Sequence, residues 1–137
     1  MNDVTSDDLR AIPLFEGASD AALERLTSSA GEMTCEAGQV LALQGDPGSG
    51  MFVILDGSVS VEWRGGSVGL GPGDFFGELT LLAPGGTRTA RVRASSHVTC
   101  LAIPRDDALA LVESEPTVAL AMLKEIARRF ASALPDA

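Results

Sequence analysis

The sequence contains few of the residues that form metal centres or disulfide scaffolds. It holds one histidine and two cysteines in 137 residues. Cys35 and Cys100 are not in a metal-ligand spacing, and each falls in a strand-like apolar run, which favours burial over metal or redox chemistry. His97, as the only histidine, offers no cluster of ligands to a metal ion. We therefore predict a protein with no metal and no other resident cofactor.

Basic side chains are also scarce. The chain has 10 basic against 19 acidic residues and a formal net charge of -9, which opposes the phosphate contacts that dominate affinity for nucleic acids. No apolar run reaches the roughly 18 residues that span a bilayer, and no signal-peptide pattern opens the sequence. We therefore expect no direct nucleic-acid binding and no membrane insertion. We also expect a cytoplasmic protein, or the cytoplasmic part of a longer one.

Hydrophobic residues make up 45% of the sequence, which is enough for one domain to fold without metal or disulfide crosslinks. We predict a single domain over 1–137, with an N-terminal helical part at 1–31, a β part at 32–103 and C-terminal helices at 104–134. Within the first part, residues 19–30 begin with a Ser-Asp capping signal and end before a glycine. They therefore predict a short amphipathic helix.

The β part consists of short runs rich in valine, leucine, isoleucine and phenylalanine. Turn signals separate these runs every 8 to 12 residues, a spacing typical of an all-β barrel or sandwich. Asp56-Gly57 is predicted to be the clearest hairpin turn. The predicted strands lie at 32–35, 39–43, 50–55, 58–63, 67–70, 89–94 and 98–103.

Helical spacing returns after Pro104 and again after Pro116, and both prolines suit the first turn of a helix. On the second helix, a polar stripe is formed by Glu125, Arg128, Arg129 and Ser132. A wide apolar arc is formed by Val118, Ala119, Met122, Leu123, Ile126 and Phe130. This arc is wider than a single contact with the barrel requires. Two interpretations stay open: burial on the domain itself, or an added contact with a partner helix or a ligand.

The segment FGELTLLAPGGTRTA, residues 76–90, is too apolar for an ordinary exposed loop. Gly77 lacks a Cβ and precedes what resembles a turn of helix, whose free N–H groups attract an anion. Arg88 offers a guanidinium fork that matches two phosphate oxygens. Glu78 is repelled by a phosphate but accepts hydrogen bonds from a neighbouring sugar hydroxyl. The segment therefore indicates a nucleotide site, unless Glu78 and Arg88 simply pair with each other.

Three blocks of the sequence match one known family in order and in spacing. FFGEL at 75–79 and RTA at 88–90 match a phosphate-binding cassette of the form F-x-G-E-L, a short helix, then R-[ST]-A. Upstream, 45–61 and 71–79 match two further patterns of the same family. The chain thus resembles the cyclic nucleotide-binding domains of bacterial catabolite activator proteins, protein kinase regulatory subunits and cyclic nucleotide-gated channels.

The resemblance implies a fold and a set of ligand contacts. The fold would be an antiparallel β jelly roll (a double-stranded β-helix) of eight strands, mainly β, with N-terminal helices and two C-terminal hinge and lid helices. Glu78 would bind the ribose 2'-hydroxyl, and Arg88 would bind the cyclic phosphate. The family pattern places further ligand contacts at Gly77, Leu79, Thr89, Ala90, Val61 and Val68, the two valines being near the base. Arg91 and Arg93 alternate with small apolar residues and are predicted to point to water.

The function implied by the resemblance is that of a cyclic nucleotide sensor without enzymatic activity. Nucleotide binding would reposition the C-terminal helices, and an attached or associated effector would respond. Thr89 is found in family members of either specificity, and we favour cAMP over cGMP. Bacterial transcription factors of the family carry a DNA-binding domain after the lid helix, so we expect the effector outside this chain, which ends at Ala137. The C-terminal helix is a candidate surface for a homodimer.

Two other functions stay open at this point. The first is a degenerate barrel that serves only in protein association, with Glu78 and Arg88 paired to each other. The second is a cupin-type enzyme, a similar small barrel that holds a metal through several histidines; the single histidine argues against it. No nucleophile in the sequence is placed beside a base, so we expect no enzymatic activity.

Overall fold

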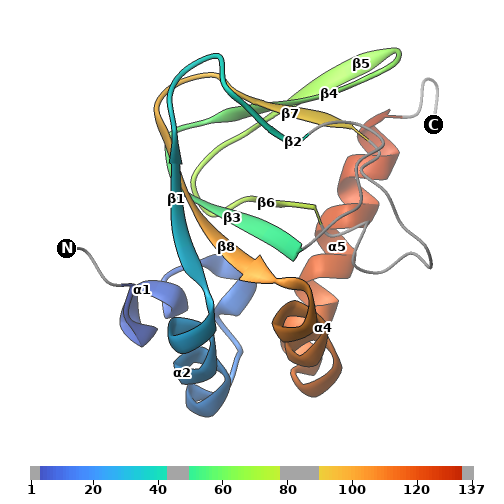
Figure 1. Cartoon of the computed structure of the whole chain (residues 1–137). Coiled ribbons are helices and arrows are strands. Elements are labelled where there is room, and N and C mark those ends of the chain that lie inside the picture. The colour runs from blue at the N-terminus through green and yellow to red at the C-terminus, as the bar shows by residue number, and fades with distance from the viewer. Residues whose placement is uncertain (1–3, 43–49, 78–89, 134–137) are drawn as a thin grey trace.

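The computed structural model describes residues 4–42, 50–77 and 90–133, and two four-stranded antiparallel sheets form its centre (Figure 1). Sheet A has the strand order β1 (Gly31–Cys35), β8 (Val98–Pro104), β3 (Gly50–Asp56) and β6 (Phe75–Phe76). Sheet B has the order β2 (Val40–Ala42), β7 (Arg91–Ala94), β4 (Val59–Trp63) and β5 (Gly66–Leu70). These eight described strands confirm the predicted fold class.

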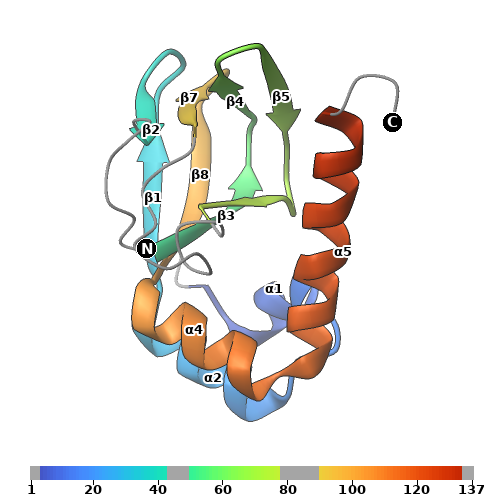
Figure 2. The same ribbon diagram turned by 90° about the vertical axis from the view of Figure 1, so that its right-hand side faces the viewer.

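The helices precede and follow the strands in the chain. They are α1 (Ser6–Arg10), the 3-10 helix η1 (Pro13–Phe15), α2 (Asp20–Ser29), α4 (Arg105–Ser114) and α5 (Pro116–Ala133). The predicted helix at 19–30 is α2, and its Ser19 hydroxyl accepts a hydrogen bond from the Ala22 amide at 3.2 Å. Figure 2 shows α1, α2 and α4 at one end of the barrel, whereas α5 runs along its side.

The central strands of sheet A, β3 and β8, are buried on both faces, and each face belongs to a different core. In β3, Val53 packs towards the helices and Ile54 towards sheet B, because successive side chains of a strand point to opposite faces. The helix-side core consists of Leu9, Ile12, Leu14, Phe15, Ala18, Ala22, Leu23, Leu26, Met51, Val53, Phe75, Leu101, Ile103, Ala108, Leu111, Val118 and Met122. The barrel core consists of Ile54, Val59, Leu70, Phe76, Val92, Ala94, Val98 and Cys100.

The apolar arc of α5 is divided between the domain and the solvent. Val118 and Met122 are buried in the helix-side core, as expected if the helix packs on its own domain. In contrast, Leu123 of the arc is 62% exposed, and Leu120, which lies outside the predicted arc, is 51% exposed. Burial on the domain therefore accounts for only one side of the arc. The side chain of Phe130, also part of the predicted arc, lies outside what the structure describes.

The predicted hairpin at Asp56-Gly57 is wrong. Strand β3 is paired with β8 on one side and with β6 on the other, so β4 cannot pair with it. At Gly57 the chain instead crosses from sheet A to sheet B, with a φ of 85° that suits glycine. The observed hairpin joins β4 to β5, where Trp63 is opposite Gly66. An Asp-Gly pair favours a tight turn in general. The pairing of the strands decides whether that turn closes a hairpin or leads to the other sheet.

The other strand predictions agree with the described strands to within two residues at each end, apart from one missing element; the predicted ends at residues 43 and 89 lie outside the described residues. Strand β6 was not predicted, because two residues are too few to show an alternating pattern. No helix within 4–42, 50–77 and 90–133 is long and apolar enough to cross a membrane.

Candidate functional site

The described ends of the predicted cassette adjoin different sheets. Strand β6 of sheet A is followed by Gly77, whose φ of 90° is a backbone conformation that glycine adopts without strain. On the far side, the half-buried Ala90 precedes β7 of sheet B. The segment between them therefore joins the two sheets. Four of the predicted ligand contacts lie outside the described residues, so their roles stay predictions: Glu78, Leu79, Arg88 and Thr89.

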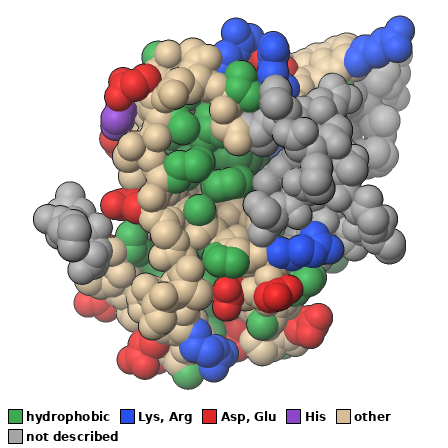
Figure 3. Space-filling model, viewed as in Figure 1, with side chains coloured by type: hydrophobic (Ala, Val, Ile, Leu, Met, Phe, Trp, Pro, Cys, Tyr) green, Lys and Arg blue, Asp and Glu red, His purple; other side chains and the backbone are tan. Residues whose placement is uncertain are grey.

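The two predicted base contacts, Val61 and Val68, lie directly opposite each other on β4 and β5. Both are half-buried, and Val61 packs against the barrel core. The next pair along the same face, Val59 and Leu70, is fully within that core, so Val61 and Val68 also face the interior. Figure 3 shows hydrophobic side chains gathered between the two sheets. This surface can receive a flat apolar group such as a nucleobase.

The strand that leads into the cassette is held by aromatic packing. Phe76 lies opposite Phe52 on β3, and their rings stack with centroids 5.0 Å apart and an interplanar angle of 20°. Such a pair contributes about 0.5–1.5 kcal/mol beyond the burial of its area. Phe76 immediately precedes Gly77, so the start of the cassette is anchored to sheet A.

Helix α5 contacts the same strand from the other face. The guanidinium carbon of Arg129 lies 4.7 Å from the centroid of the Phe75 ring, and its Nε donates a 3.0 Å hydrogen bond to Glu125. The side chain of Arg129 is only 17% exposed. Glu125 also accepts hydrogen bonds from Arg128, and these arginine contacts hold the pKa of the Glu125 carboxyl below its usual range.

This contact between α5 and β6 was not predicted from the sequence, which indicated only a polar stripe on the helix. The available signal was the position of Glu125 and Arg129 in this stripe, beside the apolar arc of the helix. Arg129 and Phe75 are 54 positions apart, and no local pattern in the sequence predicts a contact between them. The sheet order decides this, because β6 is the edge strand of sheet A.

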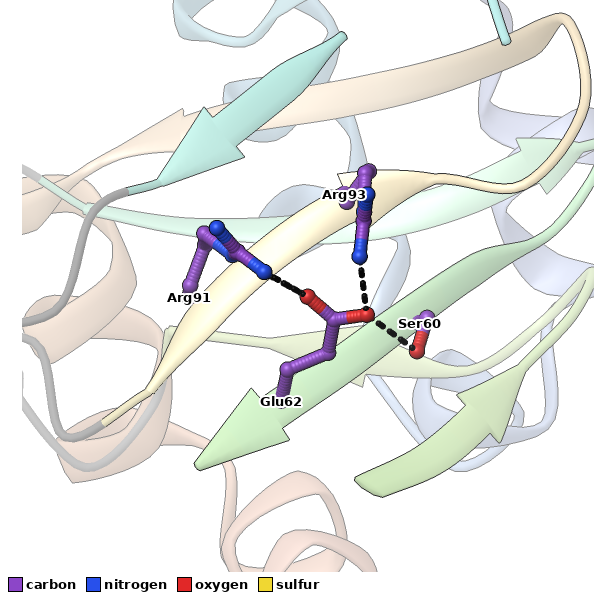
Figure 4. Close-up of polar contacts among 4 residues, drawn as sticks. All are labelled: Ser60, Glu62, Arg91 and Arg93. Carbon is purple, nitrogen blue, oxygen red and sulfur yellow. Dashed lines mark hydrogen bonds and ion pairs between the residues drawn. The ribbon is translucent and has the colours of Figure 1, made fainter. Parts of the chain in front are cut away.

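Arg91 and Arg93 point away from the barrel interior, as predicted from their alternation with Val92 and Ala94 (Figure 4). Both form ion pairs with Glu62 on the neighbouring strand, at 2.6 Å for Arg91 and 2.7 Å for Arg93. Hydrogen bonds from Arg93 and then Arg91 lower the pKa of the Glu62 carboxyl. These two arginines therefore belong to the outer face of sheet B and not to the predicted nucleotide site.

The cysteines are structural in character. Cys100 is fully buried and Cys35 half-buried, and both pack in the barrel interior as free thiols. Burial raises the pKa of the Cys100 thiol to about 11. His97 pairs with Glu36 at 3.1 Å on the surface. Among the described residues, no group of three or more histidine, cysteine or acidic side chains is placed to hold a metal ion.

Comparison with known proteins gives a consistent result. The family model of the cyclic nucleotide-binding domain matches residues 32–115. A cyclic nucleotide-gated potassium channel of Mesorhizobium japonicum is 38% identical over 109 residues, which are 80% of this chain and 30% of the channel. The cyclic AMP receptor protein of Thermus thermophilus is 31% identical over 91% of this chain and 60% of the receptor.

A solved structure extends the likeness to the fold. The N-terminal domain of a transcriptional regulator from Streptomyces coelicolor superposes with a TM-score of 0.65 and 34% identity, over 96% of this chain and 99% of that domain. The chain spans less than two thirds of both sequence relatives named above. The match to the family model covers most of the sequence and includes all the predicted ligand contacts. The chain therefore belongs to the cyclic nucleotide-binding domain family.

Proposed function

We propose that the chain is a sensor domain that binds cAMP in the barrel and passes the binding signal to an effector through its C-terminal helices. In this proposal Arg88 binds the cyclic phosphate and Glu78 binds the ribose hydroxyl. Gly77, Leu79, Thr89 and Ala90 complete the cassette, and Val61 and Val68 contact the base. The effector belongs to another domain or another protein.

One observation carries the proposal. Gly77 directly follows β6 of sheet A and Ala90 directly precedes β7 of sheet B, and the inward pair Val61–Val68 belongs to sheet B. A ligand held by the cassette would therefore be placed beside an apolar surface, with its charged part at the cassette. This division of polar and apolar contacts suits a nucleotide.

The preference for cAMP is supported by one of the relatives named above. The Thermus thermophilus relative is a cyclic AMP receptor protein, whereas the Mesorhizobium japonicum channel is described only as gated by a cyclic nucleotide. Thr89 is compatible with either base. We therefore expect both nucleotides to bind, with the higher affinity for cAMP.

Signal transmission is supported by the contact between Arg129 and Phe75. Phe75 lies two residues before Gly77, so a change in the cassette that moves β6 also alters a contact of α5. A ligand can shift the position of α5 only if it binds the two arrangements with different affinity. The exposed side chains of Leu120 and Leu123 on α5 offer a surface for a second copy of the chain or for the effector.

Titration calorimetry with cAMP and cGMP tests the proposal directly. Charge-assisted hydrogen bonds contribute about 1.5–3 kcal/mol each, and about 1.4 kcal/mol is a tenfold change in affinity, so Arg88→Ala should weaken cAMP binding at least tenfold. Arg91→Ala is the matched control, because Arg91 is on the outer face of sheet B and should leave the affinity unchanged. Absence of binding by either nucleotide at submillimolar concentration would favour a barrel that serves only in protein association.

A further inference from the structure

A hollow lies outside the barrel, beside the face of sheet A that the helices cover. It has a volume of about 440 Å³ and is bordered by α1, η1, strands β1 and β3 and the turn at 72–73. Glu32, on its border, is opposite Leu101, which belongs to the helix-side core. Of its lining residues on β3, Leu55 packs against the helix-side core, whereas the side chain of Ile54 belongs to the barrel core. Neither Val61 nor Val68 is among the described lining residues, so the hollow is distinct from the proposed base contacts.

The floor of this groove is apolar. Val4, Ile12 and Leu55 line it, and all three are part of the helix-side core or pack against it. Leu55 and Val4 are only partly buried. The volume is within the range of about 300–1,000 Å³ typical of ligand sites, which allows it to take one or two large apolar side chains.

The rim of the groove is acidic. Asp8 on α1 and Glu32 on β1 line it with exposed carboxylates, and no basic residue is among the described lining residues. The Thr5 amide donates a 3.0 Å hydrogen bond to Asp8, and this bond lowers the pKa of the Asp8 carboxyl, so the group stays ionised at neutral pH. Figure 3 shows further acidic side chains over α1 and α2.

We propose that this groove docks an amphipathic, positively charged segment of a partner protein. An apolar side chain of the segment would enter the groove over Leu55, and lysine or arginine side chains would pair with Asp8 and Glu32. Charge complementarity selects this partner, since the carboxylates and the net charge of -9 repel phosphate groups, whether in nucleic acids or in anionic lipids. The groove does not depend on nucleotide binding.

The test uses the whole chain and a fluorescein-labelled peptide with leucine and lysine at helical spacing, followed by fluorescence anisotropy. Glu32→Lys should weaken peptide binding by roughly three- to tenfold, because attraction at the rim becomes repulsion. Ala11→Arg, which fills the exposed edge of the groove, should weaken it similarly. The matched control is Glu24→Lys, an equal change of charge at an exposed position of α2 that does not line the groove.

The outcomes separate the docking groove from general attraction to an acidic protein. Equal loss of affinity in Glu24→Lys and Glu32→Lys would overturn the proposal, as would equal binding of a peptide whose leucines are replaced by alanine. Unchanged peptide binding in Arg88→Ala is expected, which keeps this proposal independent of the nucleotide site. Melting curves of both groove variants establish whether they are folded. If Glu32→Lys does not fold, the peptide affinity of Ala11→Arg tests the proposal.

Discussion

The guanidinium of Arg129 lies over the ring of Phe75, 4.7 Å from the ring centroid, and joins the last third of α5 to the strand that enters the cassette. The contact is largely shielded from water, since the Arg129 side chain is 17% exposed. A cation over an aromatic ring contributes about 0.5–2 kcal/mol, and the larger values apply where water is excluded. This pair thus links the C-terminal helix to the strand that enters the cassette.

Arg129→Met should therefore increase local opening of α5 as well as lower the stability of the folded protein. We expect the free energy of unfolding to fall by about 0.5–2 kcal/mol and amide hydrogen exchange in the second half of α5 to become faster. Arg128→Met is the matched control, because Arg128 also bonds Glu125 but is exposed. The same acceleration of exchange in both variants would show that the ion pair with Glu125, and not the ring of Phe75, holds the helix.

The ion pairs of Glu62 predict how stability depends on pH. Because Arg93 and Arg91 lower the pKa of Glu62 in the folded protein, their stabilising effect is present above the unfolded pKa, about 4.3, and is lost as the pH falls through the folded pKa. Glu62→Gln should therefore be less stable than the wild type at pH 7. Urea unfolding between pH 7 and pH 3 measures the difference in the free energy of unfolding between the wild type and Glu62→Gln, and this difference should fall towards zero at low pH. A difference that is constant with pH would contradict the ion pairs of Glu62 as its cause.

Gly57 marks the crossing between the two sheets and should not accept a side chain. A Cβ on Gly57 would lie 2.1 Å from the carbonyl oxygen of His97, in addition to the strain of a φ of 85°. Gly65→Ala is the control, since φ is 104° there and nothing lies within 4 Å of the added Cβ. We expect a loss of about 1–2 kcal/mol for Gly65→Ala from strain alone and a larger loss for Gly57→Ala.

Thermal melting of the two glycine variants measures this difference. Equal loss of stability in Gly57→Ala and Gly65→Ala would mean that the backbone at residues 57 and 97 can move apart at a small cost in free energy. That result would contradict a crossing held closely against His97.

The exposed leucines of α5 predict a surface for self-association. Leu120 and Leu123 are three residues apart and therefore lie on the same side of the helix. If a homodimer forms through α5, the double variant Leu120→Glu/Leu123→Glu should be monomeric in sedimentation experiments and should keep its thermal stability. Ala110→Glu, at an exposed position of α4, is the control. A wild-type protein that is monomeric at all concentrations would contradict the predicted dimer.

Local patterns in the sequence were sufficient for most of the elements. The Ser19 cap and the glycine after Ala30 delimit α2, and the alternation of Arg91, Val92, Arg93 and Ala94 correctly places the arginines outside the barrel. These features depend on neighbours in the chain, whose geometry follows from the helical or strand period. The resemblance to cyclic nucleotide-binding domains likewise came from residues close together in the sequence.

Pairing between distant segments was decided only by the tertiary structure. Asp56-Gly57 forms a crossing and not a hairpin because β8 and β6 occupy both edges of β3. The contact of Arg129 with Phe75 and the acidic groove between α1 and β1 also depend on which strand lies at which edge of sheet A. The sequence by itself determined the periods and the caps, and it predicted the cassette residues. Only long-range packing, which buries each face of the central strands of sheet A in a separate core, determined how those parts meet.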